Sequence, residues 1–406
     1  MQKFEKHSPV VVTEVTTKHE LRQFMQYPNR LYADNPNYIP SFYGDDLSDW
    51  TPGKNPAFDY CEARCWLARR DGEIVGRIGA ILSHKANDKF GTHRMRFSQV
   101  DFVDDSEVSA ALFGTVERWA REKGCDQVHG PLGFTDMDRE GMLVEGFDRR
   151  SLFFTNYNAP YYLEHLTRLG YRKDVDWIEY RITVPEPGGA EAERLHKLSE
   201  FILKRKHLHV ATVHHKSEYG PFVRQVFELV NAAYAPLYGV VELSDEQIER
   251  YANKFIPLVD PDFVCFVVDE QDQLVAFGVT ALDPSVALKH SDGRLFPFGW
   301  AGVLNDLHHS YTLIMLLTAV RPDLQAEGIN AVMMDHVCQS CNRHGVRFAE
   351  TGPMLELNDH ILAQWKRLEK EQHKRRRCFI KDLDHDVNAA NAAAAQTETP
   401  ETESAE

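Results

Sequence analysis

One stretch, residues 312–330, constrains the fold of this chain more than any other. It begins with an apolar, strand-length run that stops before Pro322. A short loop containing Gln325 and Gly328 follows, and a helical pattern then starts at Ile329. Such a turn leaves backbone N–H groups pointing outward beside the partial positive charge of a helix N-terminus, which suits a phosphate or pyrophosphate. Many strand–loop–helix units bind no ligand, so the stretch alone indicates a fold element and not a function.

Length and composition narrow the class of protein. With 406 residues the chain exceeds the usual size of one hydrophobic core, so we expect two domains. A net charge of −15 argues against a protein that coats nucleic acid. The first residues contain no apolar signal-peptide core, and the longest apolar run, 311–320, is about half of what a bilayer span needs. These features, with seven cysteines, predict a cytoplasmic protein that lies peripherally at the inner membrane face at most.

The predicted elements occur in nearly the same order in both halves. Each half contains helices, a hairpin, a strand, a helix, a short strand, a helix and a last strand, and the hairpin turn at residues 70–73 is the clearest of these signals. The Pro- and Gly-rich segment 185–189 is the clearest linker. We therefore predict an N-terminal domain over residues 1–185, a C-terminal domain over 186–383 and a disordered acidic tail over 384–406.

This element order and the Gln-x-x-Gly turn resemble the GNAT superfamily of acyl-CoA N-acyltransferases. The resemblance rests on Val320, Gln325 and Gly328, and on Asn358, which begins a later helix. It implies an α/β fold with a mixed sheet, built as two tandem GNAT-like domains, and acyl-CoA or acetyl-CoA as co-substrate without a metal. The implied CoA-binding residues lie in the turn and at its edges: Val320, Gln325, Ala326, Glu327, Gly328, Ile329 and Asn330.

Two departures from the superfamily pattern bear on function. Asn330 stands where the superfamily usually has Gly or Ala, and its side chain could either crowd a pyrophosphate or donate a hydrogen bond to it. The first half lacks the turn, because Asp104, Asp105 and Glu107 follow its third strand and would repel a pyrophosphate. We therefore expect CoA in the second half only.

A narrower resemblance comes from the run 75–80 together with Glu140-Gly141 and residues 146–148. It is similar to a bacterial branch of tandem proteins, some of which are linked to bacterial ceramide synthesis. That likeness implies transfer of an acyl group from CoA to an amine, in particular the long-chain amine of a sphingoid base.

Aminolysis of a thioester needs a proton acceptor and donors for the oxyanion. Glu350 and Glu356 follow predicted strands and are the candidate catalytic carboxylates, with Asn358 as a candidate that orients a water molecule or the CoA arm. The alternatives are solvated loop carboxylates and, for Asn358, a helix cap.

Substrate-binding candidates come from the first half. Asp138 and Glu140, with the neighbouring Asp136, could recognise an amine, whereas their spacing lacks the remaining features of a calcium loop. Tyr161 belongs to an aromatic set that either lines a pocket or packs in the core.

The basic run 370–381 is unusual in an acidic chain. Lys374, Arg375, Arg376 and Arg377 could meet CoA phosphates or anionic lipid headgroups, and the plainer alternative is a solvated strand edge. The main prediction is thus an acyltransferase that acts on a small-molecule or lipid amine, without a nucleic-acid partner. A non-catalytic GNAT-like binding or scaffold protein is the alternative, and a nucleic-acid regulator would rest on the basic run alone.

Overall fold

The computed structural model describes residues 8–383 of the chain. The predicted acidic tail at 384–406 lies outside these residues. Among the described residues, no helix is both long enough and apolar enough to cross a membrane.

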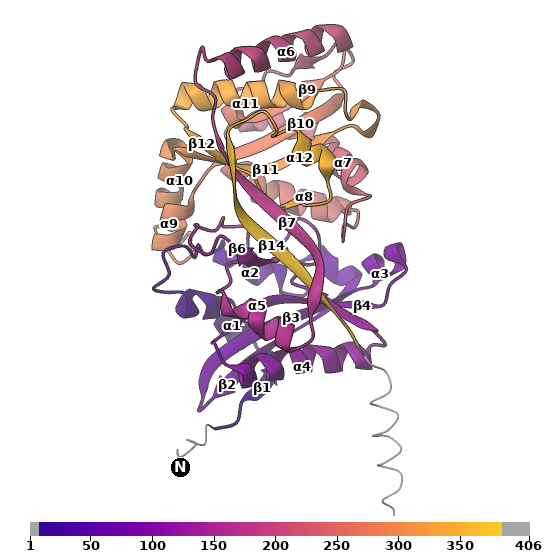
Figure 1. Ribbon diagram of the computed structural model, residues 1–406, viewed down its shortest axis with the longest axis vertical. Helices are drawn as coiled ribbons and strands as arrows, with labels where there is room; N and C mark the ends of the chain where they lie inside the picture. Colours follow the sequence, from indigo (N-terminus) through magenta and orange to yellow (C-terminus); the bar gives the residue numbers. More distant parts are fainter. Residues whose placement is uncertain (1–7, 384–406) are drawn as a thin grey trace, which may run out of the picture.

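The strands join into one mixed sheet that runs through the whole described chain (Figure 1). Its order is β1-β2-β3-β4-β5-β14-β7-β12-β11-β10-β9-β8, and the short strands β6 and β13 pair with β14 and β7. The strands span β1 Val11–Glu14, β2 Cys61–Arg70, β3 Glu73–Ser83, β4 Arg94–Phe102, β5 Gln127–Gly130, β6 Met142–Glu145, β7 Arg172–Thr183, β8 His209–Val210, β9 Val264–Val268, β10 Leu274–Leu282, β11 Thr312–Val320, β12 Phe348–Glu350, β13 Met354–Leu355 and β14 Lys370–Asp382.

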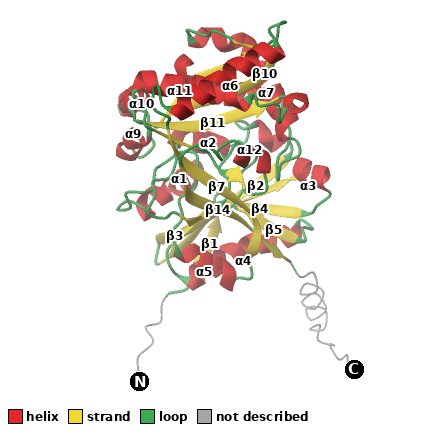
Figure 2. Ribbon diagram, turned by 45° about the horizontal axis from the view of Figure 1, so that its top comes forward, coloured by secondary structure: helices red, strands yellow, loops and turns green. Residues whose placement is uncertain are grey.

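Helices cover both faces of this sheet. They span α1 Lys18–Leu31, α2 Tyr43–Asp49, α3 His84–Phe90, α4 Ser106–Glu122, α5 Tyr161–Arg168, α6 Ala190–Lys206, α7 Gly220–Tyr234, α8 Asp245–Phe255, α9 Ser285–His290, α10 Gly299–His309, α11 Asn330–His344 and α12 Asp359–Ala363. Figure 2 shows α6 and α11 lying together over the end of the molecule that contains β10 and β11. The apolar residues of α11 and of α7 belong to two different core clusters of the second half, so these two helices pack on opposite faces of β10 and β11.

The last strand of each half lies beside strands of the other half. β14, from the end of the chain, is hydrogen-bonded between β5 and β7, and β7 in turn pairs with β12. Figure 1 shows β7 and β14 side by side through the middle of the molecule. The predicted limits at 185 and 383 remain a prediction, but five strand pairings join the segments on either side of residue 185.

The basic run is β14 itself, and its cations are paired inside the sheet. Lys374 and Arg376 are 1% and 0% exposed and both contact the carboxylate of Glu179. Arg375 and Arg377 both pair with Asp176 on β7, at 3.1 and 2.7 Å. Lys374 and Arg376 therefore face the packed interior, as alternate residues of a central strand do. Membrane contact through the basic run remains a prediction that only its partly exposed members, Arg375 and Arg377, could serve.

Candidate functional site

The turn after β11 has the conformation that its sequence predicts. Ala326 and Gly328 have positive φ angles of 64° and 85°, and a Cβ atom on Gly328 would lie 3.0 Å from the Ile202 side chain. Gln325 Nε2 donates to the backbone oxygen of Val320 at 3.2 Å, which ties the loop to the strand end. Conformation and packing thus both require glycine at position 328.

The N-terminus of α11 is open to a ligand. Its N-cap residue, Ile329, supplies no side-chain cap. Within the described part of the chain, the backbone N–H groups of Ala326, Gly328, Ile329 and Asn330 have no protein acceptor. The last turn of α6, next to this loop, provides cations, and Lys206 Nζ already lies 2.6 Å from the carboxylate of Glu327. The arrangement matches a phosphate site, while occupation by CoA remains a prediction.

β11 and β12 separate after a short paired segment, and the separation opens the sheet. They pair in parallel only from Thr312 to Ile314, opposite Phe348 to Glu350. The segment that follows β12 stays beside β7, because Thr351 N donates to Tyr180 O at 2.9 Å. β11 instead continues along β10. The β10–β11 register shifts between Val279 and Thr280, which places a bulge beside the opening.

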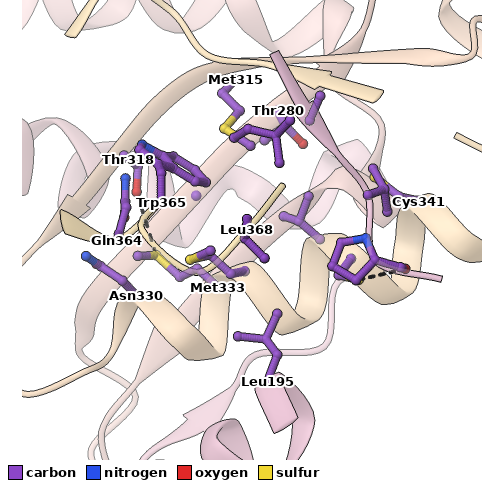
Figure 3. Close-up of a pocket in the computed structure, with 18 of the residues that line it drawn as sticks. Leu195, Thr280, Met315, Thr318, Asn330, Met333, Cys341, Gln364, Trp365 and Leu368 are labelled. Atoms are coloured by element: carbon purple, nitrogen blue, oxygen red, sulfur yellow. Dashed lines mark hydrogen bonds between the residues drawn. The ribbon is translucent and has the colours of Figure 1, made fainter. Parts of the chain in front are cut away.

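A cavity of about 730 Å³, its open side included, lies on the α11 side of this opening. Figure 3 shows Asn330 near one end and Cys341 at the other, with Met333 between them and Met315, Thr318 and Trp365 on the facing wall. Most of its lining side chains are aliphatic, aromatic or sulfur-containing. Its lining is that of a site for an apolar ligand.

A second cavity, of about 890 Å³ with its open side included, shares five lining residues with the first. The shared residues are Met315, Leu317, Thr318, Gln364 and Trp365. Its remaining wall includes Tyr234 from α7, Tyr238 from the loop after it, and Asp136 and Glu140 from the first half of the chain. The opening between β11 and β12 thus joins an apolar cavity to one that contains carboxylates.

The two carboxylates of the second cavity are unusual because no described cation pairs with them. Burial, followed by the charge of Asp138, raises the pKa of Asp136 to about 6. Burial and the neighbouring Asp136 raise the pKa of Glu140 well above its ordinary value of 4.5. Raised pKa values of this kind suit groups that exchange protons near neutral pH.

The structure separates the predicted substrate residues. Glu140 lines the second cavity, together with Asp136. Asp138 instead accepts hydrogen bonds from the backbone of Phe134 and Thr135, at 2.8 and 3.2 Å, and so holds its own loop. Tyr161 donates to Phe102 O and packs against the core of the first half, and it does not line the second cavity.

The predicted catalytic residues do not all lie at the second cavity either. Glu350 lies 3.2 Å from Lys374, Glu356 lies 3.1 Å from Arg375, and neither lines the second cavity. Asn358 does line it, and also accepts a hydrogen bond from Ile361 N at 3.3 Å as the cap of α12. A catalytic role for any of the three remains a prediction.

Tyr238 is a site residue that the sequence gives no signal for, since it lies in an irregular loop. Its hydroxyl donates to Asp174 at 2.5 Å and lies 3.0 Å from His129 Nδ1 and 3.5 Å from Cys378 Sγ. His129, Asp174 and Cys378 are close enough to hold a metal ion, with their ligand atoms within 4.8 Å of one another. The Tyr238 hydroxyl, however, already contacts all three of these groups.

Comparison with known proteins finds two that are similar in sequence over most of this chain. No protein-family model matches the sequence. Protein YghO of Escherichia coli (strain K12) is 27% identical over 379 residues, which cover 92% of this chain and 95% of that protein. A protein described as bacterial ceramide synthase, from Caulobacter vibrioides (strain NA1000 / CB15N), is 28% identical over 300 residues, 72% of this chain and 75% of that protein.

Solved structures decide the fold. A tandem GNAT protein from the clavulanic acid biosynthesis pathway aligns with a TM-score of 0.53 and 14% identity, over 92% of this chain and 99% of that one. The chain has a tandem GNAT fold. A GCN5-related N-acetyltransferase from Sphaerobacter thermophilus also aligns, with a TM-score of 0.50 and 12% identity, over 92% and 96% of the two chains. The fold implied by Gln325, Gly328 and the repeated element order is thus confirmed, and in this tandem GNAT fold the open turn belongs to the second half.

Proposed function

We propose that this protein is an N-acyltransferase that moves a long acyl group from CoA to a long-chain amine. The observation that carries the proposal is the opening between β11 and β12. On the α11 side it meets an apolar cavity below a turn with four unpaired backbone N–H groups, and on the other side it meets the two carboxylates Asp136 and Glu140.

In this arrangement the CoA pyrophosphate lies on the turn at residues 325–330 and the pantetheine arm enters the first cavity. The thioester then reaches the opening near Met315, where β11 no longer pairs with β12 and its backbone on that side can donate to the oxyanion. The amine arrives through the second cavity, and Glu140 takes a proton from its ammonium form. Attack of the neutral nitrogen forms the C–N bond and breaks the C–S bond, and the second nitrogen proton goes to the leaving thiolate.

The length of the acyl group follows from the far end of the first cavity. It continues along α11 for about 16 Å, from Asn330 to Cys341, at a rise of roughly 1.5 Å per residue. Val337, Cys338 and Leu195 form its walls at that end. A pantetheine arm does not require this apolar extension, whereas a hydrocarbon chain does.

The chemistry of the acceptor draws support from a relative. The Caulobacter protein is described as a bacterial ceramide synthase. A ceramide is the amide of a fatty acid and a long-chain amino alcohol, so an apolar acceptor with one amine fits both that description and the second cavity. Aromatic and aliphatic residues line most of this cavity, and its unpaired carboxylates attract an ammonium group.

The test is product formation by the purified full-length protein. Palmitoyl-CoA and acetyl-CoA are each supplied with sphinganine or with a short amine, and free thiol and amide product are measured by absorbance and mass spectrometry. We expect the palmitoyl amide of sphinganine as the favoured product. Binding of acyl-CoA without product from any pair would favour the scaffold alternative, and absence of both would contradict the proposal.

A variant in the wall of the first cavity tests where the acyl chain of the donor lies. Cys338→Phe fills the far end of the first cavity, and we expect it to lower kcat/KM for palmitoyl-CoA at least tenfold while leaving kcat/KM for a short acyl-CoA within about threefold. Cys338→Ser, which keeps the volume, is the matched control. Equal losses of kcat/KM for long and short acyl-CoA donors would show that the acyl chain lies elsewhere.

A further inference from the structure

The segment from α9 to the start of β11 exposes an unusual set of apolar side chains. Phe296 and Phe298, in the loop between α9 and α10, are 80% and 81% exposed. Trp300 and Leu304 follow on α10 at 47% and 45%. Figure 1 shows α9 and α10 stacked at one edge of the molecule, beside β11 and β12. We call Phe296, Phe298, Trp300 and Leu304 the aromatic patch.

α10 has one apolar face that the chain covers only in part. Val303 and Leu307 are buried and pack with Leu288 of α9 and Ile314 of β11. Trp300 and Leu304 belong to the same face by their helical spacing, but they lie at its edge and stay about half exposed. Packing within the chain accounts for Val303 and Leu307 and leaves the aromatic patch unexplained, and exposed apolar groups of this kind mark interaction sites.

The polar atoms next to the patch already have partners inside the segment. The Trp300 indole N–H donates to Pro297 O at 3.2 Å. His308 Nδ1 and His309 Nδ1 lie 2.6 and 2.9 Å from backbone oxygens one turn earlier. When the patch is transferred out of water, the indole N–H therefore keeps its hydrogen bond. An unpaired N–H in an apolar environment would cost free energy.

The charge of the segment also differs from that of the whole chain. Between residues 285 and 311 the cations Lys289 and Arg294 balance Asp292 and Asp306, in a chain of net charge −15. This segment is thus close to neutral in an acidic protein, and an anionic surface repels it less than it repels the chain on average.

We propose that the aromatic patch inserts into the interfacial layer of a lipid bilayer. Protruding phenylalanine rings at a loop tip, a tryptophan with a satisfied N–H and nearby basic groups together form a surface for the boundary between headgroups and acyl chains. The inference stands on exposure and charge alone and goes beyond the acyl transfer proposed above.

Vesicle flotation with the full-length protein tests the proposal without any acyl-CoA or turnover. We expect the protein to float with phosphatidylcholine vesicles and with vesicles that also contain phosphatidylglycerol. The triple variant Phe296→Ser, Phe298→Ser, Trp300→Ser should reduce the bound fraction at least fivefold. Phe201→Ser, which changes a 57% exposed phenylalanine on α6, should leave it unchanged.

A labelled variant keeps the test independent of folding defects. All seven native cysteines are buried, so a thiol-reactive, environment-sensitive dye will label a new surface cysteine selectively. Ala301→Cys on α10 should give a blue shift on adding vesicles, whereas Lys197→Cys on α6 should not. Equal vesicle binding by wild type and triple variant, or no binding by wild type, would overturn the proposal. A wild-type dimer that the triple variant converts to monomer, with vesicle binding unaltered, would assign the patch to a second copy of the chain and likewise overturn it.

Discussion

Asp136 and Glu140 show how a residue's role depends on partners that its local sequence does not name. The three acidic residues at 136, 138 and 140 look equivalent in sequence, but Asp138 caps its own loop while the other two line the second cavity. Their raised pKa values arise from burial by Tyr234, Tyr238 and neighbouring segments far along the chain. Sequence alone could place the carboxylates in a functional loop, but it could not choose among them.

Replacing Glu140 should lower the activity and raise the stability. Glu140→Gln should lower the acyl-transfer rate by about 10²–10³-fold, because it removes the general base. It should raise Tm at pH 7, since a folded-state pKa above the unfolded value makes the ionised carboxylate a cost at high pH, and the gain should vanish below pH 4.5. Rate assays and thermal melts from pH 5 to 8 check both effects.

Asp136→Asn serves as the companion variant. The negative charge of Asp136 raises the pKa of Glu140. Removing this charge should therefore move the acid limb of the pH–rate profile to lower pH while leaving much of the plateau rate. Glu371→Gln, in an exposed pair with Arg149, should change neither the limb nor the plateau. A normal profile for Glu140→Gln would exclude that residue as the base.

At the scale of elements, the hairpin of β2 and β3, the helix α4 and the turn before α11 could all be predicted, because each depends on local periodicity and turn residues. β14 could not. Its basic residues resemble a solvated edge, and only the position of the strand between β5 and β7 reveals that Lys374 and Arg376 meet Glu179 in the interior. Burial would raise the pKa of Glu179, but Arg376 and Lys374 outweigh that effect and hold the pKa below its ordinary value.

This buried cluster predicts a large stability effect. Glu179→Gln leaves the buried Arg376 without a carboxylate and Lys374 with Glu350 alone, and it should lower the free energy of unfolding by about 3–5 kcal/mol. Glu371→Gln breaks the exposed pair with Arg149 and should cost less than about 1 kcal/mol. Urea unfolding at pH 7 compares the two, and similar midpoints would argue against the strand placement. Because the folded pKa of Glu179 is depressed, the wild type should lose this contribution as the pH falls below 4.5.

At the scale of the whole molecule, the two halves complete each other. The opening lies between β11 and β12, yet the cavity beside it also contains Asp136 and Glu140 from the first half, and β7 and β14 connect the two parts of the sheet. The repeated element order predicts two copies of one fold, but local patterns contain no information on which copy a final strand joins. A first half without a CoA turn thus still contributes to the site.

Splitting the chain tests this interdependence. Residues 1–185 alone leave β5 and β7 without β14, and residues 186–383 alone leave β12 without β7. We expect each fragment to be insoluble or unfolded when expressed separately, and co-expression to restore a soluble complex. A folded, monomeric fragment 1–185 by NMR would show that the strand exchange is dispensable.

The most direct measurement is a crystal structure of the full-length protein with a non-hydrolysable thioether analogue of palmitoyl-CoA. The account predicts the pyrophosphate on the backbone N–H groups of residues 326–330, the thioether sulfur between β11 and β12, and the alkyl chain along α11 toward Cys341. An analogue bound at the first-half segment 104–107, or one whose sulfur lies outside the opening between β11 and β12, would contradict it.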